Sequence, residues 1–321
     1  MEHFRPYSPE DIILSNLDEC AKRHFHLFEQ EIAHLSELAK ELIENRAEAS
    51  DAISSIPEFH LSEHPLPECD ATSPHKHLNK QISDIHIAEK QILLSEEIRK
   101  RLSIDPTRPP SEFFRDAEKD VIGTEQNVVY QKNSFADTAY LQFASLLNAP
   151  RAVYTHSFLS ACEDVYNGSC EYCILPLENT SEGLLVGFAK LIERFGLKIV
   201  ATCDIFGNEG ARLTRFALLR KNILPLPKQS TLQNCFLEIS VPFENPQTPN
   251  DLLIAAGLCN LPLSRIHSLP YTEEHEPSRY HAAFQISEQS LLSTFLIYLT
   301  MEIPQYTLTG IYPHIPYQSK K

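Results

Sequence analysis

Apolar residues recur at alternating steps of three and four near the start of the chain. The run follows Ser8-Pro9-Glu10-Asp11, where a serine cap, a proline in the first turn and two acids favour the start of a helix. This spacing is a heptad seam, so it predicts a long helix that packs lengthwise against a partner. The seam residues are Leu14, Leu17, Ala21, Phe25, Phe28, Ile32, Leu35, Ala39 and Leu42.

A second run with helical spacing follows a break rich in proline and histidine. It predicts a helix that ends near Leu102, because Pro106, Pro109 and Pro110 come next. The two runs together predict an N-terminal helical hairpin, which we expect to dimerise. The apolar residues of the second run include Leu78, Ile82, Ile85, Ala88 and Ile92.

Two groups of potential metal ligands have spacings that argue against a metal. Cys170 and Cys173 form a single CxxC pair, with no second pair to complete a zinc site. The histidine and cysteine residues of the break match no standard zinc spacing. They are mixed with Glu and Pro, a composition that is typical of a solvated loop. We therefore expect neither a metal nor a cofactor. The break residues concerned are His60, His64, Cys69, His75 and His77.

Residues 127–223 alternate short β-type runs with helical ones. This alternation predicts an α/β fold with a mostly parallel, doubly wound sheet, which binds ligands at the carboxyl ends of its strands. The expected strands are 128–130, 152–154, 172–177, 197–202 and 213–219, and the expected helices are 134–147, 158–167 and 184–195.

The turn Glu178-Asn179-Thr180-Ser181-Glu182-Gly183 has two interpretations. Its short polar side chains, with the free amides of the next helix, suit a ligand that bears a carboxylate. Alternatively, Thr180 or Ser181 caps the start of that helix in a capping box. The residues alone favour the capping box.

The last part of the chain has the order strand, helix, strand, strand, helix, strand. After a linker at Pro225-Leu226-Pro227, this order predicts a βαββαβ ferredoxin-like unit of the α+β class. The expected strands are 235–241, 263–269, 280–286 and 306–312, and the expected helices are 249–259 and 288–299.

Composition and charge exclude several classes of protein. The 321 residues are 42% apolar with a net charge of −15, so the chain can bury substantial cores but cannot neutralise the phosphates of a nucleic acid. No apolar run reaches the roughly 18 residues of a membrane helix, and the N-terminus MEHFRPYSPEDI lacks the apolar core of a signal peptide. Eight scattered cysteines suit a reducing compartment, so we expect a cytoplasmic protein with no membrane partner.

Glycine and charge divide the chain near residue 122. All 9 glycines lie at or after Gly123, and residues 1–122 hold 14 Lys or Arg against 25 Asp or Glu. We therefore expect an acidic helical region at 1–122, an α/β lobe at 123–224 and the ferredoxin-like unit at 230–321.

Three segments of the α/β lobe together resemble the prephenate dehydratase family, whose members make phenylpyruvate on the way to phenylalanine. The segments are Val128-Val129-Tyr130 with Ser134-Phe135, Glu171-Tyr172-Cys173-Ile174-Leu175-Pro176-Leu177-Glu178-Asn179-Thr180-Ser181-Glu182-Gly183, and Leu213-Thr214-Arg215-Phe216. The resemblance implies that Thr214 is the catalytic hydroxyl, and that Ser134, Asn179 and Thr180 line a pocket shaped by Arg215 and Phe216. For Arg215, a structural ion pair within the lobe is an equal alternative.

Prephenate is a dianion that loses carbon dioxide and hydroxide together, driven by the gain of an aromatic ring. Such a site needs donors for two carboxylates and a group that protonates the departing oxygen. Here only 34 residues separate Thr180 from Thr214, and Gln131-Lys132-Asn133 replaces the family's glycine-containing loop. We therefore expect most of the family's second lobe to be missing.

Because the ferredoxin-like unit follows this lobe, it resembles the ACT domain that senses phenylalanine in this family. The segment His267-Ser268-Leu269-Pro270 keeps Ser268 and Pro270 of the family's Glu-Ser-Arg-Pro motif, which makes these two residues candidate effector contacts. Gln247-Thr248-Pro249 replaces Gly-Ala-Leu, so dimerisation is the alternative role of this unit.

Residues 1–122 occupy the place of the chorismate mutase domain in bifunctional relatives. The best match, 27–31, has Glu31 where an arginine is expected, and an acidic region is a poor site for a dianion. Three functions stay open: a reduced or degenerate prephenate dehydratase that acts as a homodimer; a non-catalytic relative that serves as an amino-acid sensor or interaction scaffold; and a bifunctional chorismate mutase/prephenate dehydratase.

Overall fold

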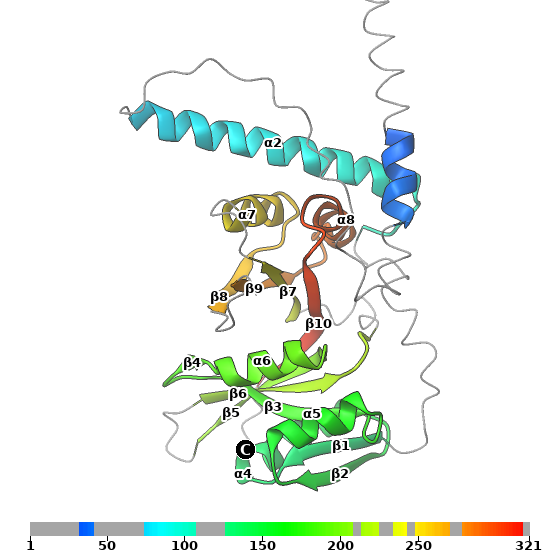
Figure 1. Ribbon diagram of the computed structural model, residues 1–321, viewed down its shortest axis with the longest axis vertical. Helices are drawn as coiled ribbons and strands as arrows, with labels where there is room; N and C mark the ends of the chain where they lie inside the picture. Colours follow the sequence, from blue (N-terminus) through cyan, green and yellow to red (C-terminus); the bar gives the residue numbers. More distant parts are fainter. Residues whose placement is uncertain are drawn as a thin grey trace, which may run out of the picture.

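The computed structural model describes residues 32–41, 74–106, 126–207, 213–224, 234–242, 248–269 and 278–316. Figure 1 shows the α/β lobe at the bottom, a C-terminal unit above it and the long helix α2 (Pro74–Arg101) across the top. Below, "lobe" means residues 126–224 and "C-terminal unit" means residues 234–316.

The lobe has helices on both faces of its sheet, because its strand residues alternate between two cores. Val128 and Tyr130 pack with Phe143 of α4 on one face, whereas Val129 packs with residues of α5 and α6 on the other. The predicted α/β fold is therefore confirmed. The elements are β1 (Gln126–Gln131), α4 (Ser134–Phe143), η3 (Ala144–Leu146), β2 (Pro150–Thr155), α5 (Phe158–Tyr166), β3 (Tyr172–Asn179), β4 (Gly183–Leu184), α6 (Val186–Arg194), β5 (Lys198–Phe206) and β6 (Leu213–Arg220).

The sheet of the lobe is mixed in direction, so the expectation of a mostly parallel sheet is wrong. β1 pairs in parallel with β2 and β3, as expected. β6 runs antiparallel to both β3 and β5, because the short connection from β5 allows only a return in the opposite direction. The interval from Thr180 to Thr214 holds β4, α6 and β5, and its described residues include no second lobe.

Two expectations for the segment after β3 are wrong. Gly183–Leu184 forms strand β4, which pairs with the end of β3, so α6 begins only at Val186. The N-cap residue Leu185 makes no side-chain capping hydrogen bond, which rules out the capping box by Thr180 or Ser181. Gly183 has a φ angle of +71°, which a glycine adopts without strain and which lets the chain turn back onto β3.

The C-terminal unit has the predicted βαββαβ order, with α7 and α8 on one face of its strands. Leu237 and Phe284 pack with Leu296 of α8 on that face. Because strand residues alternate, Glu238 and His281 lie on the opposite face, towards the lobe. The elements are β7 (Cys235–Pro242), α7 (Thr248–Leu258), β8 (Leu263–Leu269), β9 (Arg279–Ile286), α8 (Leu292–Glu302) and β10 (Thr307–Ile315).

The start of α8 also differs from the expectation. The helix was expected from residue 288, but it begins at Leu292. Ser287 and Ser290 bond to each other in a turn just before it, with the Ser287 amide 2.9 Å from the Ser290 hydroxyl. Serine side chains that bond to nearby backbone compete with the helix in this way.

A single ten-stranded sheet runs through both parts, in the order β2-β1-β3-β6-β5-β10-β7-β9-β8 with β4 beside β3. β10 pairs in parallel with β5 of the lobe and antiparallel with β7. Figure 1 shows β10 reaching down from the C-terminal unit to the lobe. At Gly310 an added Cβ would lie 2.6 Å from the carbonyl oxygen of Ile199, so the two strands approach closely because this residue has no side chain.

Helix α2 (Pro74–Arg101) and the helix at 32–41 cover the helical side of the C-terminal unit. Figure 1 shows α2 lying across α7 and α8, with the short helix crossing its carboxyl end rather than lying lengthwise along it. The seam residues Leu35 and Ala39 are buried with Ile98 of α2 and Ile297 of α8. Ile32 of the seam is also buried. The other predicted seam residues, most of the Pro- and His-containing break and the 225–227 linker lie outside the described residues.

Candidate functional site

Thr214 and Asn179 lie opposite each other on neighbouring strands. They are register partners in β6 and β3, at the carboxyl end of β3. The contact continues through Thr180, whose amide donates to the carbonyl of Leu213 at 3.0 Å and whose hydroxyl accepts from the Leu213 amide at 3.3 Å. The expected catalytic residue and two of the expected pocket residues therefore share one edge of the sheet.

The side chain of Asn179 shapes the turn that leads to β4. Its Oδ1 accepts hydrogen bonds from the amides of Ser181 and Glu182, at 3.0 and 2.6 Å. Asn179 therefore fixes the backbone of the turn beside Thr214.

Ser134 lies on the same side of the sheet as Thr214. Successive side chains of a strand alternate in direction, so Thr214 shares a face with Phe216, which is buried in the core that includes α4. Ser134 is exposed in the first turn of α4, beyond the carboxyl end of β1. β1 runs parallel to β3, so Ser134 and Asn179 follow strand ends at the same edge.

Arg215 bonds to two carboxylates of its own lobe, on the opposite face of the strand. Its Nε and Nη2 donate to the carboxylate of Asp204 at 2.8 and 3.2 Å, and its Nη1 lies 3.3 Å from Glu178 Oε2. Burial alone would lower the pKa of Arg215, but the two acids outweigh it and raise the pKa. The residue thus makes the structural ion pair that was the alternative to substrate contact.

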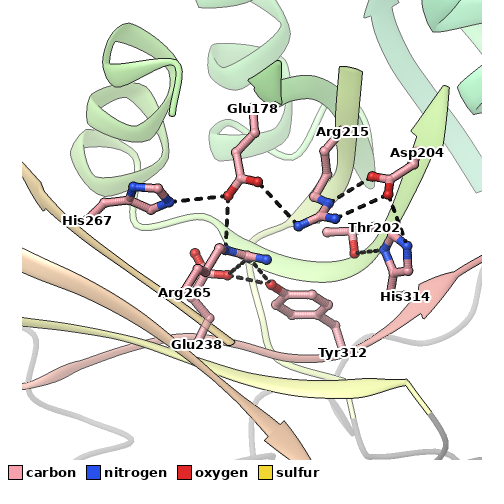
Figure 2. Close-up of polar contacts among 9 residues, drawn as sticks. All are labelled: Glu178, Thr202, Asp204, Arg215, Glu238, Arg265, His267, Tyr312 and His314. Carbon is pink, nitrogen blue, oxygen red and sulfur yellow. Dashed lines mark hydrogen bonds and ion pairs between the residues drawn. The ribbon is translucent and has the colours of Figure 1, made fainter. Parts of the chain in front are cut away.

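Glu178 connects the lobe to the C-terminal unit. Figure 2 shows Arg215 and Arg265 of β8 approaching its carboxylate from different directions. Arg265 Nε lies 3.0 Å from Glu178 Oε1, while Arg265 Nη2 lies 2.5 Å from Glu238 Oε2 and 2.6 Å from the Tyr312 hydroxyl. The Tyr312 hydroxyl also donates to Glu238. One guanidinium therefore joins β3 to β7, β8 and β10.

His267 approaches Glu178 from the third side. Its Nε2 lies 3.5 Å from Glu178 Oε1, an ion-pair distance without the geometry of a hydrogen bond. Burial alone would raise the pKa of Glu178, but His267, Arg265 and Arg215 together lower it. Glu178 is therefore an anion at neutral pH.

The cavity beside Glu178 is small. Its volume is about 20 Å³, which leaves room for one water molecule, so a substrate the size of prephenate does not fit there. Its polar lining residues are Glu178, Glu238, Arg265, His267, His281 and Thr309, and its apolar lining residues are Leu177, Leu184, Ala189, Ile192, Ile199 and Ala283.

His314 of β10 faces the other carboxylate that holds Arg215. Its Nε2 lies 3.4 Å from Asp204 Oδ2, and its Nδ1 lies 3.0 Å from the Thr202 hydroxyl (Figure 2). Burial alone would raise the pKa of Asp204, but His314 and Arg215 lower it to about 2. Asp204 is therefore ionised at neutral pH and connects β5 to β6 and β10.

A second polar cluster lies between α6 and the C-terminal unit. Glu193 Oε1 accepts from the Ser240 hydroxyl at 2.8 Å and lies 2.9 Å from His281 Nε2. Ser240 also accepts from Arg279 Nε at 2.8 Å. Ser240 and Glu193 meet the same ring nitrogen of His281, and Ser240 is fully buried. The cluster is therefore not a hydrolase triad, in which serine and acid occupy opposite nitrogens.

Solved prephenate dehydratases are among the structures to which this chain is similar. The enzyme from Streptococcus mutans is 19% identical, with a TM-score of 0.49 and coverage of 59% of this chain and 98% of that one. The enzyme from Arthrobacter aurescens, solved in complex with L-Phe, is 14% identical, with a TM-score of 0.45 and coverage of 59% and 90%.

A protein described as GqqA, a novel type of quorum quenching acylase, is also similar. It is 17% identical, with a TM-score of 0.48 and coverage of 62% of this chain and 99% of that one. No protein-family model and no curated protein matches the chain. At these identities and TM-scores the similarity identifies neither the fold, the activity nor the ligand of this chain.

The candidate effector residues belong to β8 and the segment after it. Ser268 is exposed on β8, next to the interface residue His267, whereas Pro270 and Gln247 lie outside the described residues. Among the residues that the structure describes, no group of three or more His, Cys, Asp or Glu could hold a metal ion. Within the same stretches no helix combines the length and apolarity needed to cross a membrane.

Sequence reasoning missed the residues that join the lobe to the C-terminal unit. The signal available was the alternation of polar and apolar residues in β7, β8 and β9, which indicates a polar face. This alternation does not indicate which part of the chain packs against the polar face. The missed residues are Glu193, Asp204, Glu238, Ser240, Arg265, His267, Arg279, His281, Tyr312 and His314.

Proposed function

We propose that the lobe is a prephenate dehydratase-like catalytic module in which Thr214 protonates the departing hydroxyl group. The observation that supports this most is the pairing of Thr214 with Asn179 at the carboxyl end of β3. Open α/β sheets bind their ligands at such strand ends. Thr180 on the same edge and Ser134 beyond β1 add two more hydroxyl groups.

In the proposed reaction the bond between the ring and its carboxylate breaks, and its electron pair enters the ring. The bond from the ring to the hydroxyl oxygen breaks at the same time, and that oxygen takes a proton from Thr214. The products are carbon dioxide, water and phenylpyruvate, and Thr214 regains a proton from solvent. Because aromatisation drives the reaction, a positioned hydroxyl suffices and no strong base is needed.

Arg215 makes no direct contact with the substrate in the proposed site. This residue lies on the opposite face of β6 from Thr214 and is bonded to Asp204 and Glu178. A pocket for a small ligand normally buries most of its ligand between opposing walls. We therefore propose that a second copy of the chain supplies the wall opposite Asn179 and Thr214.

The test is the conversion of prephenate to phenylpyruvate by the purified full chain. Thr214→Ala should reduce kcat by about 100-fold or more, because general acid catalysis contributes about that much, and Thr214→Ser should keep most of the activity. The control is Ser145→Ala, which removes an exposed hydroxyl elsewhere in the lobe. A folded dimer without turnover, or a fully active Thr214→Ala variant, would contradict the proposal.

A second candidate is a non-catalytic relative that acts as an amino-acid sensor or interaction scaffold. It is favoured by the pairing of β10 with β5, which joins the C-terminal unit directly to the sheet of the lobe. Phenylalanine that raises the thermal midpoint without turnover of prephenate would support a sensor. A chain with neither response would support a scaffold, and turnover of chorismate would support the bifunctional alternative.

A further inference from the structure

Two residues of the interface are the immediate chain neighbours of two residues of the proposed site. Glu178 precedes Asn179 on β3, and Arg215 follows Thr214 on β6. In the register of the two strands the interface residues are partners of each other, and so are the site residues. The candidate site and the interface with the C-terminal unit therefore share one pair of strand ends.

A register shift near the end of β3 sets the direction of these side chains. Pro176 pairs with Phe216, but the next pair is Glu178 with Arg215, so β3 contains one extra residue at Leu177. Leu177 and Glu178 both line the cavity beside the C-terminal unit. An extra residue of this kind interrupts the alternation of side chains and re-aims those that follow it. The strand end that carries the site is therefore irregular and needs contacts that hold it.

Arg265 holds this strand end from outside the lobe. Its Nε lies 3.0 Å from Glu178 Oε1, and Figure 2 shows it on the side of Glu178 away from Arg215. The guanidinium is itself anchored within the C-terminal unit by Glu238 and by the Tyr312 hydroxyl, the latter at 2.6 Å. Its side chain is only 13% exposed. The C-terminal unit therefore helps to determine where the carboxylate of Glu178 lies.

The other two contacts of Glu178 hold it less firmly. Arg215 Nη1 lies 3.3 Å from the carboxylate, and the same guanidinium is bound more closely by Asp204, at 2.8 Å. His267 Nε2 lies 3.5 Å away without the geometry of a hydrogen bond. Of the three contacts, that of Arg265 is the shortest, and an arginine keeps its charge at every pH at which the protein is folded.

We propose that Arg265 of the C-terminal unit is a positioning residue for the site of the lobe, because through Glu178 it holds Asn179 opposite Thr214. This role rests on the proposed function of Thr214, and Arg265 itself touches no substrate. Asn179 is the next residue after Glu178, and its Oδ1 accepts from the amides of Ser181 and Glu182 at 3.0 and 2.6 Å. A displacement of Glu178 therefore passes directly to the turn that borders the site. A misplacement of about 1 Å can reduce the rate of a catalysed reaction about 100-fold.

The first experiment measures amide hydrogen exchange by NMR in the full-length wild type, Arg265→Met and Arg279→Met. Arg279 is the matched control, because this interface arginine faces Glu193 of α6 rather than β3. The amides of Ser181 and Glu182 should exchange about fivefold faster in Arg265→Met than in Arg279→Met, the equivalent of one ordinary hydrogen bond.

This readout separates positioning from stability. A loss of global stability speeds exchange of core amides in both variants, whereas the amides of an exposed turn exchange through local opening. The turn amides therefore respond only if Arg265 holds the turn. Equal exchange of these two amides in Arg265→Met and Arg279→Met would overturn the proposal.

The second experiment measures the turnover of prephenate at a temperature at which circular dichroism shows every variant folded. Arg265→Met should lower kcat about tenfold or more, whereas Arg279→Met should keep kcat within about twofold of the wild type. Arg265→Lys, which retains a cation for Glu178, should recover part of the loss. Glu178→Gln combined with Arg265→Met should lower kcat little further than either change alone, because both remove the same contact. Effects of the two changes that simply multiply would contradict the role of this contact.

The two experiments distinguish failure of the positioning role from failure of the proposed function. An active wild type with an equally active Arg265→Met variant refutes the positioning role and leaves the proposed function intact. A wild type that does not convert prephenate refutes the proposed function, and the exchange of the Ser181 and Glu182 amides then decides alone whether Arg265 holds the turn.

Discussion

Replacing Gly310 by alanine tests whether the close approach of β10 to β5 holds the two parts of the molecule together. The added Cβ would lie 2.6 Å from the carbonyl oxygen of Ile199, 2.9 Å from Cδ1 of Tyr312 and 3.0 Å from Cβ of Ile199. The nearest of these atoms belongs to the backbone of a buried strand, so it cannot turn aside as a flexible side chain would. β10 must therefore move away from β5 by several tenths of an ångström.

The expected cost follows from this displacement. Overpacking of a well-packed core costs about 1–3 kcal/mol. The shift also moves Tyr312, whose hydroxyl lies 2.6 Å from Arg265, so we expect the upper half of that range. A loss of about 2 kcal/mol lowers the folding equilibrium constant by about 30-fold.

The assay is urea unfolding at neutral pH followed by far-ultraviolet circular dichroism, in which the midpoint should fall while the slope stays constant. Gly257→Ala on α7 is the matched control, because a Cβ there meets nothing within 4 Å. Since alanine favours a helix over glycine by up to about 1 kcal/mol, this control should be at least as stable as the wild type. A Gly310→Ala variant as stable as the control would refute the reasoning.

Two further predictions concern the ion pairs of the interface. The pKa of Asp204 is lowered to about 2, so its contribution of about 2 kcal/mol is present above about pH 4 and is lost as the pH falls towards 2. The difference in unfolding free energy between the wild type and Asp204→Asn, measured in urea at descending pH, should therefore shrink, and a constant difference would contradict the assignment. Arg265→Met should lower the unfolding free energy by roughly 3 kcal/mol, because it takes the shared guanidinium from Glu178 and Glu238. Arg265→Lys should restore only part of the lost unfolding free energy, because one ammonium group cannot bond to both acids as the forked guanidinium does. An Arg265→Met variant with wild-type stability would show that the ion pair is dispensable.

Most strands of the lobe could be predicted because their apolar runs are short and bounded by turns. Val128, Val129 and Tyr130 are all buried, as expected for a strand covered on both faces. The segment at Gly183 and Leu184 could not be predicted in the same way. Its residues continue the apolar pattern of the next helix, but pairing with the end of β3 decides its structure.

The candidate site could be predicted in part. Asn179 and Thr214 were brought together by the resemblance of their motifs to one family, and the structure makes them register partners, although their catalytic role stays a prediction. The interface around Arg265 could not be predicted. Its polar strand face meets the lobe only because β10 pairs with β5, and no local pattern encodes a pairing between strands so distant in sequence.

The pairing of β10 with β5 also sets an order of events during synthesis. Thr202 of β5 and His314 of β10 are separated by 112 positions, so the ribosome releases β5 long before its partner exists. An unpaired strand edge can pair with other chains, and domains generally fold as they emerge. The lobe must therefore wait with an open edge until β10 has been synthesised, and a chain that stops before β10 would be prone to aggregate.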